Sequence, residues 1–459
     1  MPGALLTDLY ELTMAASYLK RGMTAPATFS LFVRRLPPTR RFLVAAGLEH
    51  CLAYLEAFSF EAADLEYLGH LGFDDDTVAR FAQVRFTGRV RAVPEGRIAF
   101  AEEPLLEVTA PIAEAQLVET ALLNQLTFQT ALASKAARAR LAADDRIELV
   151  EFGFRRTHGT EAGMAAARCA AMVGFAATSN VEAARRYGLV AAGTMAHSYV
   201  EAFPSELEAF SAFGADLPGR ATFLVDTYDT LDGVRHAIEV INQLGLEQVA
   251  AVRLDSGDLP ALARATRGLL DEAGLASVQI FVSGGLDEMD LARFVAQGVP
   301  VDAAGLGTRL GVAADAPYLD SAYKLVAYGG RPVVKLSEGK ASLPGAKQVF
   351  RGPGLDDVLA LADEAVPAGS EPLLLEVMAG GRRLRPPGTA GDTLAAARQV
   401  FEADLAELPR AARGLDQGPG PAATLSPALR QLTGEVRAAA GQDHGGKTTK
   451  GPVPAGPEG

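Results

Sequence analysis

The sequence predicts an α/β fold in which an irregular, TIM-like α/β barrel follows an N-terminal α+β domain. Two observations favour this fold. From residue 147 to about residue 327, short apolar strands alternate with amphipathic helices, which is typical of parallel strands covered by helices. Polar residues follow the C-terminal ends of these strands, and in a barrel those ends converge on one mouth. The position of the polar residues therefore favours a barrel over a doubly wound sheet.

The elements before the barrel differ in pattern. Residues 1–115 are expected to form the α+β domain, because strand-like runs such as TFSLFV and helix-like runs such as AAGLEHCLAYLEAF are separated by Gly or Pro. Residues 116–143 contain neither Gly nor Pro and carry apolar residues at helical spacing. This segment predicts one connecting helix, or two in succession.

The barrel is expected to span residues 144–330. Residues 331–413 are expected to pack back on the N-terminal domain. Residues 414–459 are rich in Gly and Pro, which predicts a largely disordered tail with one short helix near residues 425–440. The predicted strands of the barrel are 147–152, 174–178, 189–193, 222–226, 249–254, 280–283 and 301–305, and its predicted helices include 181–188, 231–245, 259–274 and 286–298.

Composition limits the class of protein. The 459 residues are 49% hydrophobic and 22% charged, an ordinary globular composition that suggests two or three domains. A formal net charge of −13 without a Lys/Arg block argues against general nucleic-acid binding. The N-terminal stretch MPGALLTDLYELTMAASYLKRGM has no positive n-region, and charges interrupt its apolar residues. Neither a signal peptide nor a membrane span is expected, and the protein is predicted to be cytoplasmic.

Polar residues and glycines gather at the predicted strand ends. In the stretch AVRLDSGD, Asp255 can be interpreted as a helix cap, but Asp258 is better placed for that role. The carboxylate of Asp255 suits the two hydroxyls of a sugar diol. The neighbouring guanidinium of Arg253 suits a phosphate. The residues that follow the strands are Arg155, Arg156, Ser179, Asn180, His197, Asp226, Asp255, Ser283, Gly284 and residues 305–308.

Two glycine-rich turns, SGGLDE at 283–288 and GLGTRLG at 305–311, follow consecutive predicted strands. Backbone amides in such turns can bind an anion, although glycine is often needed there only for its conformational freedom. Neither turn has the P-loop spacing G-x-x-x-x-G-K-[ST]. Two such turns at one barrel mouth indicate a phosphate site, with Ser283, Gly284, Gly305, Gly307 and Thr308 as its candidate residues.

Two further strand ends carry candidate residues. EFGFRRTHG places Phe152 and Arg155 after a strand, where a core aromatic and a solvated arginine are the plain alternatives. His197, in GTMAHSYVEAF, is flanked by small residues. It can be a hydrogen-bonded structural residue, a general base, or a nucleophile toward a phosphoryl group. Its expected convergence with the phosphate turns and Asp255 favours a chemical role.

Seven stretches between residues 5 and 330 resemble nicotinate phosphoribosyltransferases: TDLYELTMAASY, EFGFRRTHG, ATSNVEAARRYG, GTMAHSYVEAF, VDTYDTLDGVRHAI, VRLDSGDL and GLGTRLGVAADAPYLDSAYKLV. The resemblance implies a type II phosphoribosyltransferase fold that works as a homodimer with shared active sites. It implies a reaction that joins nicotinate to phosphoribosyl pyrophosphate, giving nicotinate mononucleotide and pyrophosphate in NAD salvage. ATP and Mg²⁺ are implied cofactors, since this family couples ATP hydrolysis to synthesis through a phosphorylated histidine, which matches His197.

The resemblance also implies roles for binding residues. Phe152 and a Tyr10 from the other subunit would enclose the pyridine ring, although Tyr10 can also be a helix-packing residue. Ser179 stands where the related nicotinamide enzyme has an aspartate, and a serine hydroxyl favours a carboxylate substrate over an amide. Asn180 belongs to the same binding segment. Arg155 and Arg253 can each bind the nicotinate carboxylate or a phosphate.

Three alternatives stay open: a nicotinamide phosphoribosyltransferase, a quinolinate phosphoribosyltransferase, and a non-catalytic sensor of a phosphoribosyl ligand. Ser179 argues against the first, His197 against the second, and His197 together with Asp255 against the third. Some members of the family bind zinc through a C-terminal cysteine cluster. Because this chain has only Cys51 and Cys169, no structural zinc and no metal site made by a protein cluster is expected.

Overall fold

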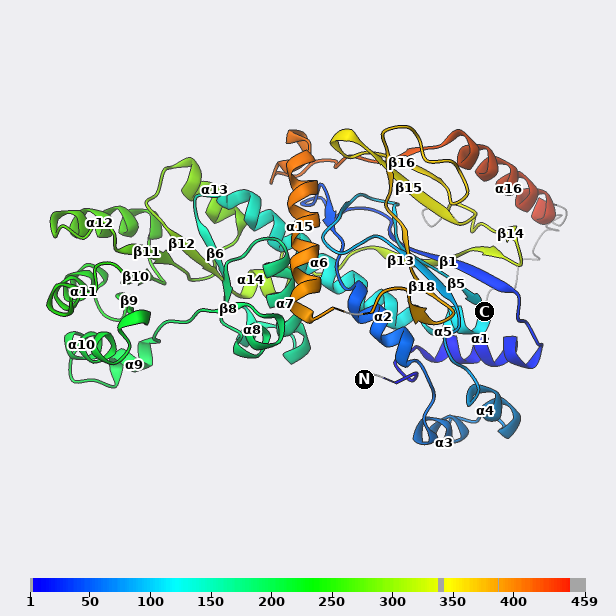
Figure 1. Cartoon of the computed structure of the whole chain (residues 1–459), viewed down its shortest axis with the longest axis horizontal. Coiled ribbons are helices and arrows are strands. Elements are labelled where there is room, and N and C mark those ends of the chain that lie inside the picture. Colours follow the sequence, from blue (N-terminus) through cyan, green and yellow to red (C-terminus); the bar gives the residue numbers. More distant parts are fainter. Residues whose placement is uncertain (1–2, 337–341, 387, 446–459) are drawn as a thin grey trace, which may run out of the picture.

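The computed structural model describes residues 3–336, 342–386 and 388–445. The molecule is elongated, with the barrel at one end and a second α/β body at the other (Figure 1). Helices α6 (Glu119–Ala143) and α15 (Ala390–Glu407) stand between the two ends. The second body, called the N-terminal body below, combines segments from both ends of the chain.

The N-terminal body is built on a seven-stranded antiparallel sheet with the order β14-β13-β1-β5-β3-β18-β19. Its central strands, β1 (Pro26–Val33) and β5 (Pro104–Pro111), are buried at nearly every position, so both faces of the sheet are covered there. The other strands are β3 (Arg89–Ala92), β13 (Ser321–Tyr328), β14 (Arg331–Pro332), β18 (Leu375–Ala379) and β19 (Arg382–Arg383).

Strand β13 corrects the predicted end of the barrel at residue 330. It pairs with β1 along its length, from Ala27 opposite Tyr328 to Val33 opposite Ser321, so the chain has left the barrel before β13 begins. The ring of Tyr323 stacks on Phe29 with 4.7 Å between centroids. The prediction failed because an apolar strand does not specify in its own sequence which sheet it will join.

Short helices surround this sheet, and two helices lead into the barrel. Helix α6 follows α5 directly, which corresponds to the predicted arrangement of two helices in succession. Residues 129–139 of α6 are buried without interruption, and many of them are alanines that let neighbouring elements approach on every side. The helices before α6 are α1 (Leu9–Lys20), α2 (Leu48–Ala57), α3 (Ala62–His70), α4 (Asp75–Phe81) and α5 (Ile112–Leu117), and β2 (Leu43–Val44) pairs with β4 (Ile98–Ala99).

The barrel end holds a seven-stranded parallel sheet with the order β8-β7-β6-β12-β11-β10-β9. All seven predicted barrel strands are present. Strands β8 and β9 are the two edges, so the sheet is an open half-barrel and confirms the irregular α/β class. The strands are β6 (Glu148–Glu151), β7 (Ala177–Thr178), β8 (Val190–Ala191), β9 (Thr222–Leu224), β10 (Ala251–Leu254), β11 (Gln279–Val282) and β12 (Ala303–Leu306).

Side-chain caps fix where the barrel helices begin after the strands. Asn180, Ser205, Asp229, Asp258 and Asp287 each accept a backbone N–H at a helix N-terminus. No helix within the described residues is long and apolar enough to span a membrane. The helices are α7 (Thr160–Met172), α8 (Val181–Tyr187), α9 (His197–Glu201), α10 (Glu206–Asp216), α11 (Thr230–Leu244), α12 (Leu259–Glu272), α13 (Glu288–Ala296) and α14 (Thr308–Gly311).

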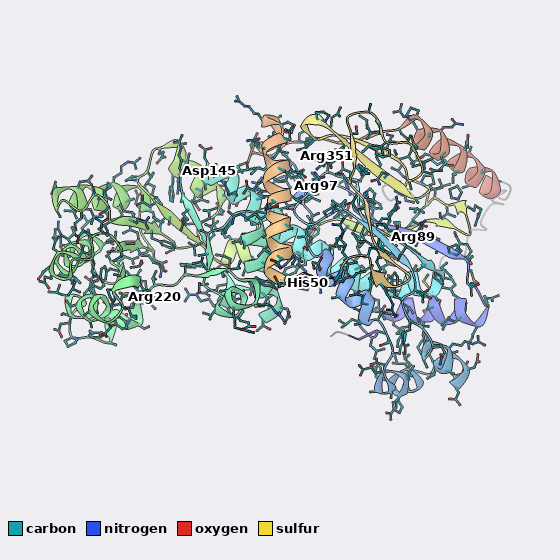
Figure 2. The ribbon with its side chains drawn as sticks, in the orientation of Figure 1. His50, Arg89, Arg97, Asp145, Arg220 and Arg351 are labelled. Carbon is teal, nitrogen blue, oxygen red and sulfur yellow. The ribbon has the colours of Figure 1, made fainter. Side chains whose placement is uncertain are left out.

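The C-terminal part of the chain packs on the N-terminal body. Arg97 of the N-terminal body and Arg351 lie near one another beside α15 (Figure 2), where both donate to the carboxylate of Asp404, at 2.7 and 2.8 Å. The new elements here are β15 (Lys347–Gly352), β16 (Asp356–Leu361), β17 (Glu371–Pro372), β20 (Thr424–Leu425) and α16 (Pro427–Gly445).

The tail after Gly414 is more ordered than predicted. The Asp416 carboxylate pairs with Arg41 at 2.8 Å, β20 pairs with β16, and Leu429 of α16 is fully buried. Helix α16 extends the short helix expected near residues 425–440. The prediction of disorder is wrong for residues 415–445. A glycine has no side chain, so the glycines of this segment also allow it to pack closely against the backbone of other segments. Residues 446–459 lie outside the described residues.

Candidate active site

Arg253, the third residue of β10, lies at the centre of the barrel mouth. Its Nε donates to Ser283 Oγ at 2.8 Å, its Nη1 to Thr194 Oγ1 at 2.8 Å, and its Nη2 to Asp255 Oδ1 at 2.6 Å. These partners come from the ends of three different strands. The guanidinium is therefore held in place before any ligand binds. Thr194 was not predicted as a site residue; its only signal in the sequence is that it follows β8 in the same stretch as His197.

Asp255 follows β10 directly and is half-buried. Ser283 also donates to its Oδ1, so within the described residues the protein hydrogen bonds use one carboxylate oxygen and leave Oδ2 for a ligand. Burial alone would raise the pKa of Asp255. The Ser283 hydrogen bond, the charge of Arg253 and the nearby His197 outweigh burial and hold this pKa below its ordinary value. Asp255 is therefore an anion at neutral pH.

Asp226, which follows β9, is the second carboxylate at the mouth. Its Oδ2 accepts from the backbone N–H of Asp255 at 3.2 Å and from the Ser256 hydroxyl at 2.5 Å. Its Oδ1 is buried and has no hydrogen-bond partner among the described residues. A buried carboxylate oxygen without a donor is unusual in a native protein and suits a cation or a donor on a ligand. The sequence placed Asp226 at a strand end but did not single it out.

His197 begins the short helix α9 and is half-buried. Its Nδ1 lies 3.2 Å from Thr227 Oγ1, in the turn after β9. This contact occupies one ring nitrogen, and Nε2 has no hydrogen bond to another of the described residues. Thr227 is the neighbour of Asp226, which accepts from the backbone N–H of Asp255, so these contacts place His197 and Asp255 on the same side of the barrel. Thr227 lies in the stretch VDTYDTLDGVRHAI but was not predicted as a site residue.

Phe152 forms one wall of the mouth. Its ring is tilted against Phe281 with 5.5 Å between centroids, and the guanidinium carbon of Arg253 lies 5.8 Å from its centroid. Gly305 makes room for this ring, since a Cβ there would lie 2.7 Å from a ring carbon of Phe152. Gly305 is fully buried in β12 and therefore shapes the aromatic wall, rather than presenting an open anion site as predicted.

The two predicted glycine turns lie on adjacent strands, β11 and β12. Gly284 has φ +103°, and a Cβ there would lie 1.9 Å from the carbonyl oxygen of Asp255, so only glycine fits. Gly307 precedes α14, and Thr308 begins this helix in an exposed position. The structure thus brings both turns to one rim of the mouth.

Ser179 and Asn180, both after β7, differ in accessibility. Ser179 is half-buried, and its backbone N–H donates to the carbonyl of Glu151 at 2.8 Å. Asn180 is fully buried, and its side chain caps α8 by accepting from Ala183 N at 3.1 Å. The predicted ligand contact by Asn180 is therefore replaced by a structural role. Arg155 lies in the exposed turn Phe154–Arg156.

Glu151, at the end of β6, is a buried acid that was not predicted as a site residue. Its carboxylate accepts from the Thr178 hydroxyl at 2.6 Å and from the backbone N–H of Gly153. Burial raises its pKa, although both hydrogen bonds oppose this rise. These contacts fix the turn that carries Phe152, so Glu151 shapes the aromatic wall from below.

Tyr10 does not meet Phe152 within one chain. It lies on α1 of the N-terminal body, at the end of the molecule away from the barrel (Figure 1). Its side chain is 47% exposed. Burial of part of the ring and the neighbouring acidic groups Glu119 and Glu11 raise its pKa well above the ordinary value. Tyr10 can reach a barrel mouth only if that mouth belongs to another subunit.

No group of three or more His, Cys, Asp or Glu side chains in the described part of the chain is arranged to hold a metal ion. Both cysteines, Cys51 and Cys169, are buried and free. Burial raises the pKa of each thiol, so neither is a reactive thiolate. At the mouth, the carboxylates of Asp226 and Asp255 belong to neighbouring turns linked by the hydrogen bond from Asp255 N to Asp226, and two carboxylates would need ligand oxygens to complete a cation site.

Comparison with known proteins places this site in a family. The model of the nicotinate phosphoribosyltransferase N-terminal domain matches residues 5–127, and the nicotinate phosphoribosyltransferase family model matches residues 147–272. A nicotinate phosphoribosyltransferase of Mycobacterium tuberculosis is 50% identical over 420 residues, which cover 90% of this chain and 89% of that protein. One of Bacillus subtilis is 42% identical over 379 residues, 79% of this chain and 77% of that protein.

A solved structure agrees with these sequence matches. The crystal structure of human nicotinic acid phosphoribosyltransferase matches with a TM-score of 0.81 and 31% identity, over 94% of this chain and 99% of that chain. The matched length includes both the barrel and the N-terminal body. The chain therefore belongs to the nicotinate phosphoribosyltransferase family.

Proposed function

We propose that the protein joins nicotinate to phosphoribosyl pyrophosphate, forming nicotinate mononucleotide and pyrophosphate in NAD biosynthesis, with coupled hydrolysis of ATP through His197. The observation that carries the proposal is the set of contacts of Arg253. One guanidinium lies against the Phe152 ring and is bonded to Asp255 and Ser283. An aromatic wall, a fixed cation and a carboxylate within one mouth suit a pyridine acid joined to a ribose.

Nicotinate would lie against Phe152, whose ring suits a flat, electron-poor aromatic ligand. Its carboxylate can accept from Arg253 or from the exposed Arg155. Ser179 supports nicotinate over nicotinamide, because a hydroxyl can donate to a carboxylate while an aspartate at this position would repel it.

The phosphoribosyl group would lie between Asp255 and the glycine turns. In the reaction, the bond between the anomeric carbon and pyrophosphate breaks, and the pyridine nitrogen supplies the electron pair for the new C–N bond. Positive charge develops on the ribose during this exchange. The ionised Asp255 can accept from ribose hydroxyls and stabilise that charge, while backbone amides of the turn at Gly284 and Gly285 can bind the 5′-phosphate.

Mg²⁺ fits the carboxylates at the mouth. Asp226 has a buried Oδ1 without a donor, and Asp255 has its Oδ2 free of protein hydrogen bonds within the described residues. Mg²⁺ is commonly held by one or two carboxylates together with substrate phosphates. When bound, it would neutralise charge on the departing pyrophosphate.

His197 is the residue proposed to couple ATP hydrolysis. With Nδ1 on Thr227, Nε2 can attack the γ-phosphorus of ATP; a P–N bond forms as the P–O bond to ADP breaks. Water later cleaves the P–N bond and releases phosphate. The phosphorylated side chain would add negative charge opposite Arg253 and the turns, and would change their affinity for pyrophosphate.

A homodimer with shared active sites is proposed because exposed apolar residues gather at two separate places. Leu6, Leu9 and Tyr10 are 53%, 56% and 47% exposed at α1 and just before it. In the barrel, Val181 at the start of α8, Val190 in the edge strand β8 and Tyr228 after β9 are 72%, 66% and 67% exposed. Two copies related by a two-fold axis can bury one patch against the other twice, which would bring Tyr10 of each copy to the mouth of its partner.

The test compares wild type with His197→Ala, using nicotinate, phosphoribosyl pyrophosphate and γ-labelled ATP. We expect acid-labile label on the wild type alone and ATP-stimulated synthesis that the variant lacks. Equal synthesis without label would leave a transferase that does not use ATP in this way. Competition among nicotinate, nicotinamide and quinolinate assigns the pyridine, and ligand binding without pyrophosphate release would favour a sensor. A cytoplasmic location stays a prediction from the N-terminal sequence.

A further inference from the structure

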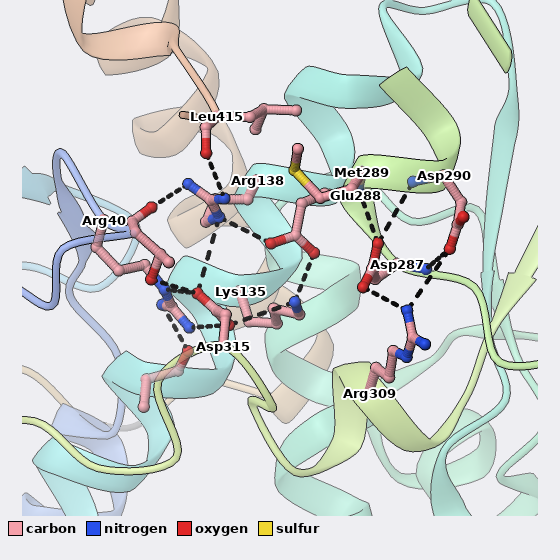
Figure 3. Close-up of polar contacts among 12 residues, drawn as sticks. Arg40, Lys135, Arg138, Asp287, Glu288, Met289, Asp290, Arg309, Asp315 and Leu415 are labelled. Carbon is pink, nitrogen blue, oxygen red and sulfur yellow. Dashed lines mark hydrogen bonds and ion pairs between the residues drawn. The ribbon is translucent and has the colours of Figure 1, made fainter. Parts of the chain in front are cut away.

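An ion pair joins the two glycine turns of the mouth. Asp287 lies three residues after Gly284, in the turn that follows β11. Arg309 lies two residues after Gly307, in the turn that follows β12. The Arg309 Nη1 donates to Asp287 Oδ2 at 2.6 Å, and the same Nη1 lies 3.7 Å from Asp290 Oδ2 (Figure 3). The two partners are 22 residues apart in the sequence. The backbone between them is therefore too long to fix the distance between the two turns.

The pair is built on ordered groups. The other Asp287 oxygen, Oδ1, caps α13 by accepting from Met289 N at 2.9 Å. Burial alone would raise the Asp287 pKa, but Arg309, the Met289 amide and Lys135 outweigh it and lower this pKa. The Asp287 side chain is 19% exposed, so the bond is partly protected from solvent screening.

A second link between the same turns lies on the buried side (Figure 3). Glu288, next to Asp287, accepts from Lys135 at 2.5 Å and from Arg138 at 2.9 Å. Asp315, which follows α14, lies 3.3 Å from the same Lys135 Nζ and accepts from Arg40 Nε at 2.6 Å. Helix α6 and the N-terminal body thus anchor both turns from below. The Asp287–Arg309 pair is the exposed counterpart of this buried network.

The pair also borders an open groove of about 800 Å³. Gly284 and Gly285 line this groove together with Arg309 and the turn at residues 257–261. A phosphate bound by the turn amides would therefore lie close to the ion pair. A shift of one turn relative to the other would move one set of phosphate donors away from the other.

We propose that Asp287 and Arg309 are positioning residues for phosphoribosyl pyrophosphate, holding the two glycine turns at the spacing that its phosphates require. This inference rests on the proposed function. Positioning and direct contact make different predictions: if Arg309 bound phosphate itself, removing Asp287 would free the guanidinium and leave binding unchanged or tighter. If the pair acts by holding the turns, loss of either partner weakens binding equally.

The experiment uses Asp287→Asn, Arg309→Gln and the double variant, with Arg309→Lys as a conservative replacement. Asparagine keeps the oxygen that caps α13, so Asp287→Asn removes the charge and not the cap. The matched control is Arg235→Gln, which breaks an exposed ion pair with Asp232 (2.5 Å) on α11, away from the turns. Binding of phosphoribosyl pyrophosphate is measured by calorimetry, and KM and kcat are measured by product formation.

We expect both single variants to bind phosphoribosyl pyrophosphate about three- to ten-fold more weakly, and the double variant no more weakly than either. KM for phosphoribosyl pyrophosphate should rise in parallel with the loss of binding, while KM for nicotinate and kcat should change less than two-fold. Arg309→Lys should recover part of the lost affinity. The control Arg235→Gln should match wild type. Wild-type affinity in Asp287→Asn, or additive losses, would overturn the inference.

The two proposals fail in different ways. Wild-type protein that binds phosphoribosyl pyrophosphate but forms no nicotinate mononucleotide would overturn the proposed function, while the binding comparison would still decide the role of the pair. Wild-type protein that does not bind phosphoribosyl pyrophosphate would overturn both.

Discussion

Arg253 in β10 and Asp255, the residue after this strand, are bonded, with Nη2 of the arginine 2.6 Å from Oδ1 of the aspartate. Together with the hydrogen bond from Ser283, the contact lowers the pKa of the Asp255 carboxyl and keeps it ionised, and the guanidinium lies beside the Phe152 ring. Two groups of opposite charge are thereby held at the mouth. Their contact joins Nη2 of the arginine to Oδ1 of the aspartate and does not involve Oδ2 of the aspartate. Both stay available for a ligand that carries an acid at one end and a ribose at the other.

Asp255→Asn should lower kcat/KM by about 100- to 1000-fold, because the amide cannot stabilise positive charge on the ribose. The measurement is the initial rate of nicotinate mononucleotide formation. Asp74→Asn is the control: Asp74 caps α4 of the N-terminal body by accepting from Thr77 N at 2.9 Å, and asparagine caps equally well. A loss of similar size in both variants would contradict a specific role for Asp255.

Thr227→Val should reduce ATP-stimulated synthesis about ten-fold while the rate without ATP is unchanged, since the His197 ring loses its 3.2 Å partner at Nδ1. Thr227→Ser keeps the hydroxyl and should restore the effect of ATP. Stimulation by ATP that is the same in the valine and serine variants would show that the hydroxyl does not orient the ring.

Gly305→Ala should raise KM for nicotinate about ten-fold, because the added Cβ would lie 2.7 Å from a Phe152 ring carbon and push the ring into the mouth. KM for phosphoribosyl pyrophosphate should change little. Gly268→Ala on α12, where a Cβ meets nothing within 4 Å, serves as the control for an added methyl group. Unchanged nicotinate affinity would mean that the ring adjusts within the wall.

Glu11 predicts a pH-dependent stability. Burial raises its pKa to about 7, against hydrogen bonds from Thr120 and Thr7 that lower it. An ordinary glutamate in the unfolded chain has a pKa of about 4.3, so between these values the folded state binds the proton more tightly and stability falls as pH rises. The free energy of unfolding should drop by about 2 kcal/mol between pH 5 and pH 8.

The Glu11→Gln variant isolates this effect, because glutamine stays neutral at every pH. The difference in unfolding free energy between wild type and Glu11→Gln, measured by denaturant titration at pH 5 and pH 8, should move in favour of the variant at the higher pH. A difference that does not change with pH would show that Glu11 ionises normally.

Gly420→Val tests the packing of the tail. A Cβ at Gly420 would lie 2.0 Å from the carbonyl oxygen of Arg41, so the tail must move away from the segment that carries Arg40 and Arg41. We expect a loss of about 1–3 kcal/mol in unfolding free energy, measured by chemical denaturation. Gly434→Ala in α16, where a Cβ meets nothing within 4 Å, should cost nothing. Equal stability of both variants would indicate that the tail does not need this contact.

Local patterns in the sequence predicted much of the fold. The seven barrel strands were readable along the chain because each is a short apolar run that ends at a polar or glycine turn. The capping residues Asp229, Asp258 and Asp287 mark helix starts in the same local way. The strand-end rule also selected Arg253, Asp255 and Ser283, which the structure brings into direct contact.

Other features depend on partners that lie far away in the chain. Thr194 and Thr227 entered the site only through their contacts with Arg253 and His197, and a lone threonine after a strand has no distinctive pattern. Asn180 followed the strand-end rule but faces inward as a cap. The network of Lys135 and Glu288 joins residues 153 positions apart, so no local spacing could indicate it.

The sequence by itself determined the alternation of strands and helices, the caps and the residues at the strand ends, because these depend on neighbours within a few positions. Only the tertiary structure decided that β13 joins the N-terminal sheet, that residues 415–445 pack against the body of the molecule, and that the two glycine turns are tied by Asp287 and Arg309. The physical reason is that strand pairing, burial and ion pairs are contacts between surfaces, and the chain brings those surfaces together only when it folds.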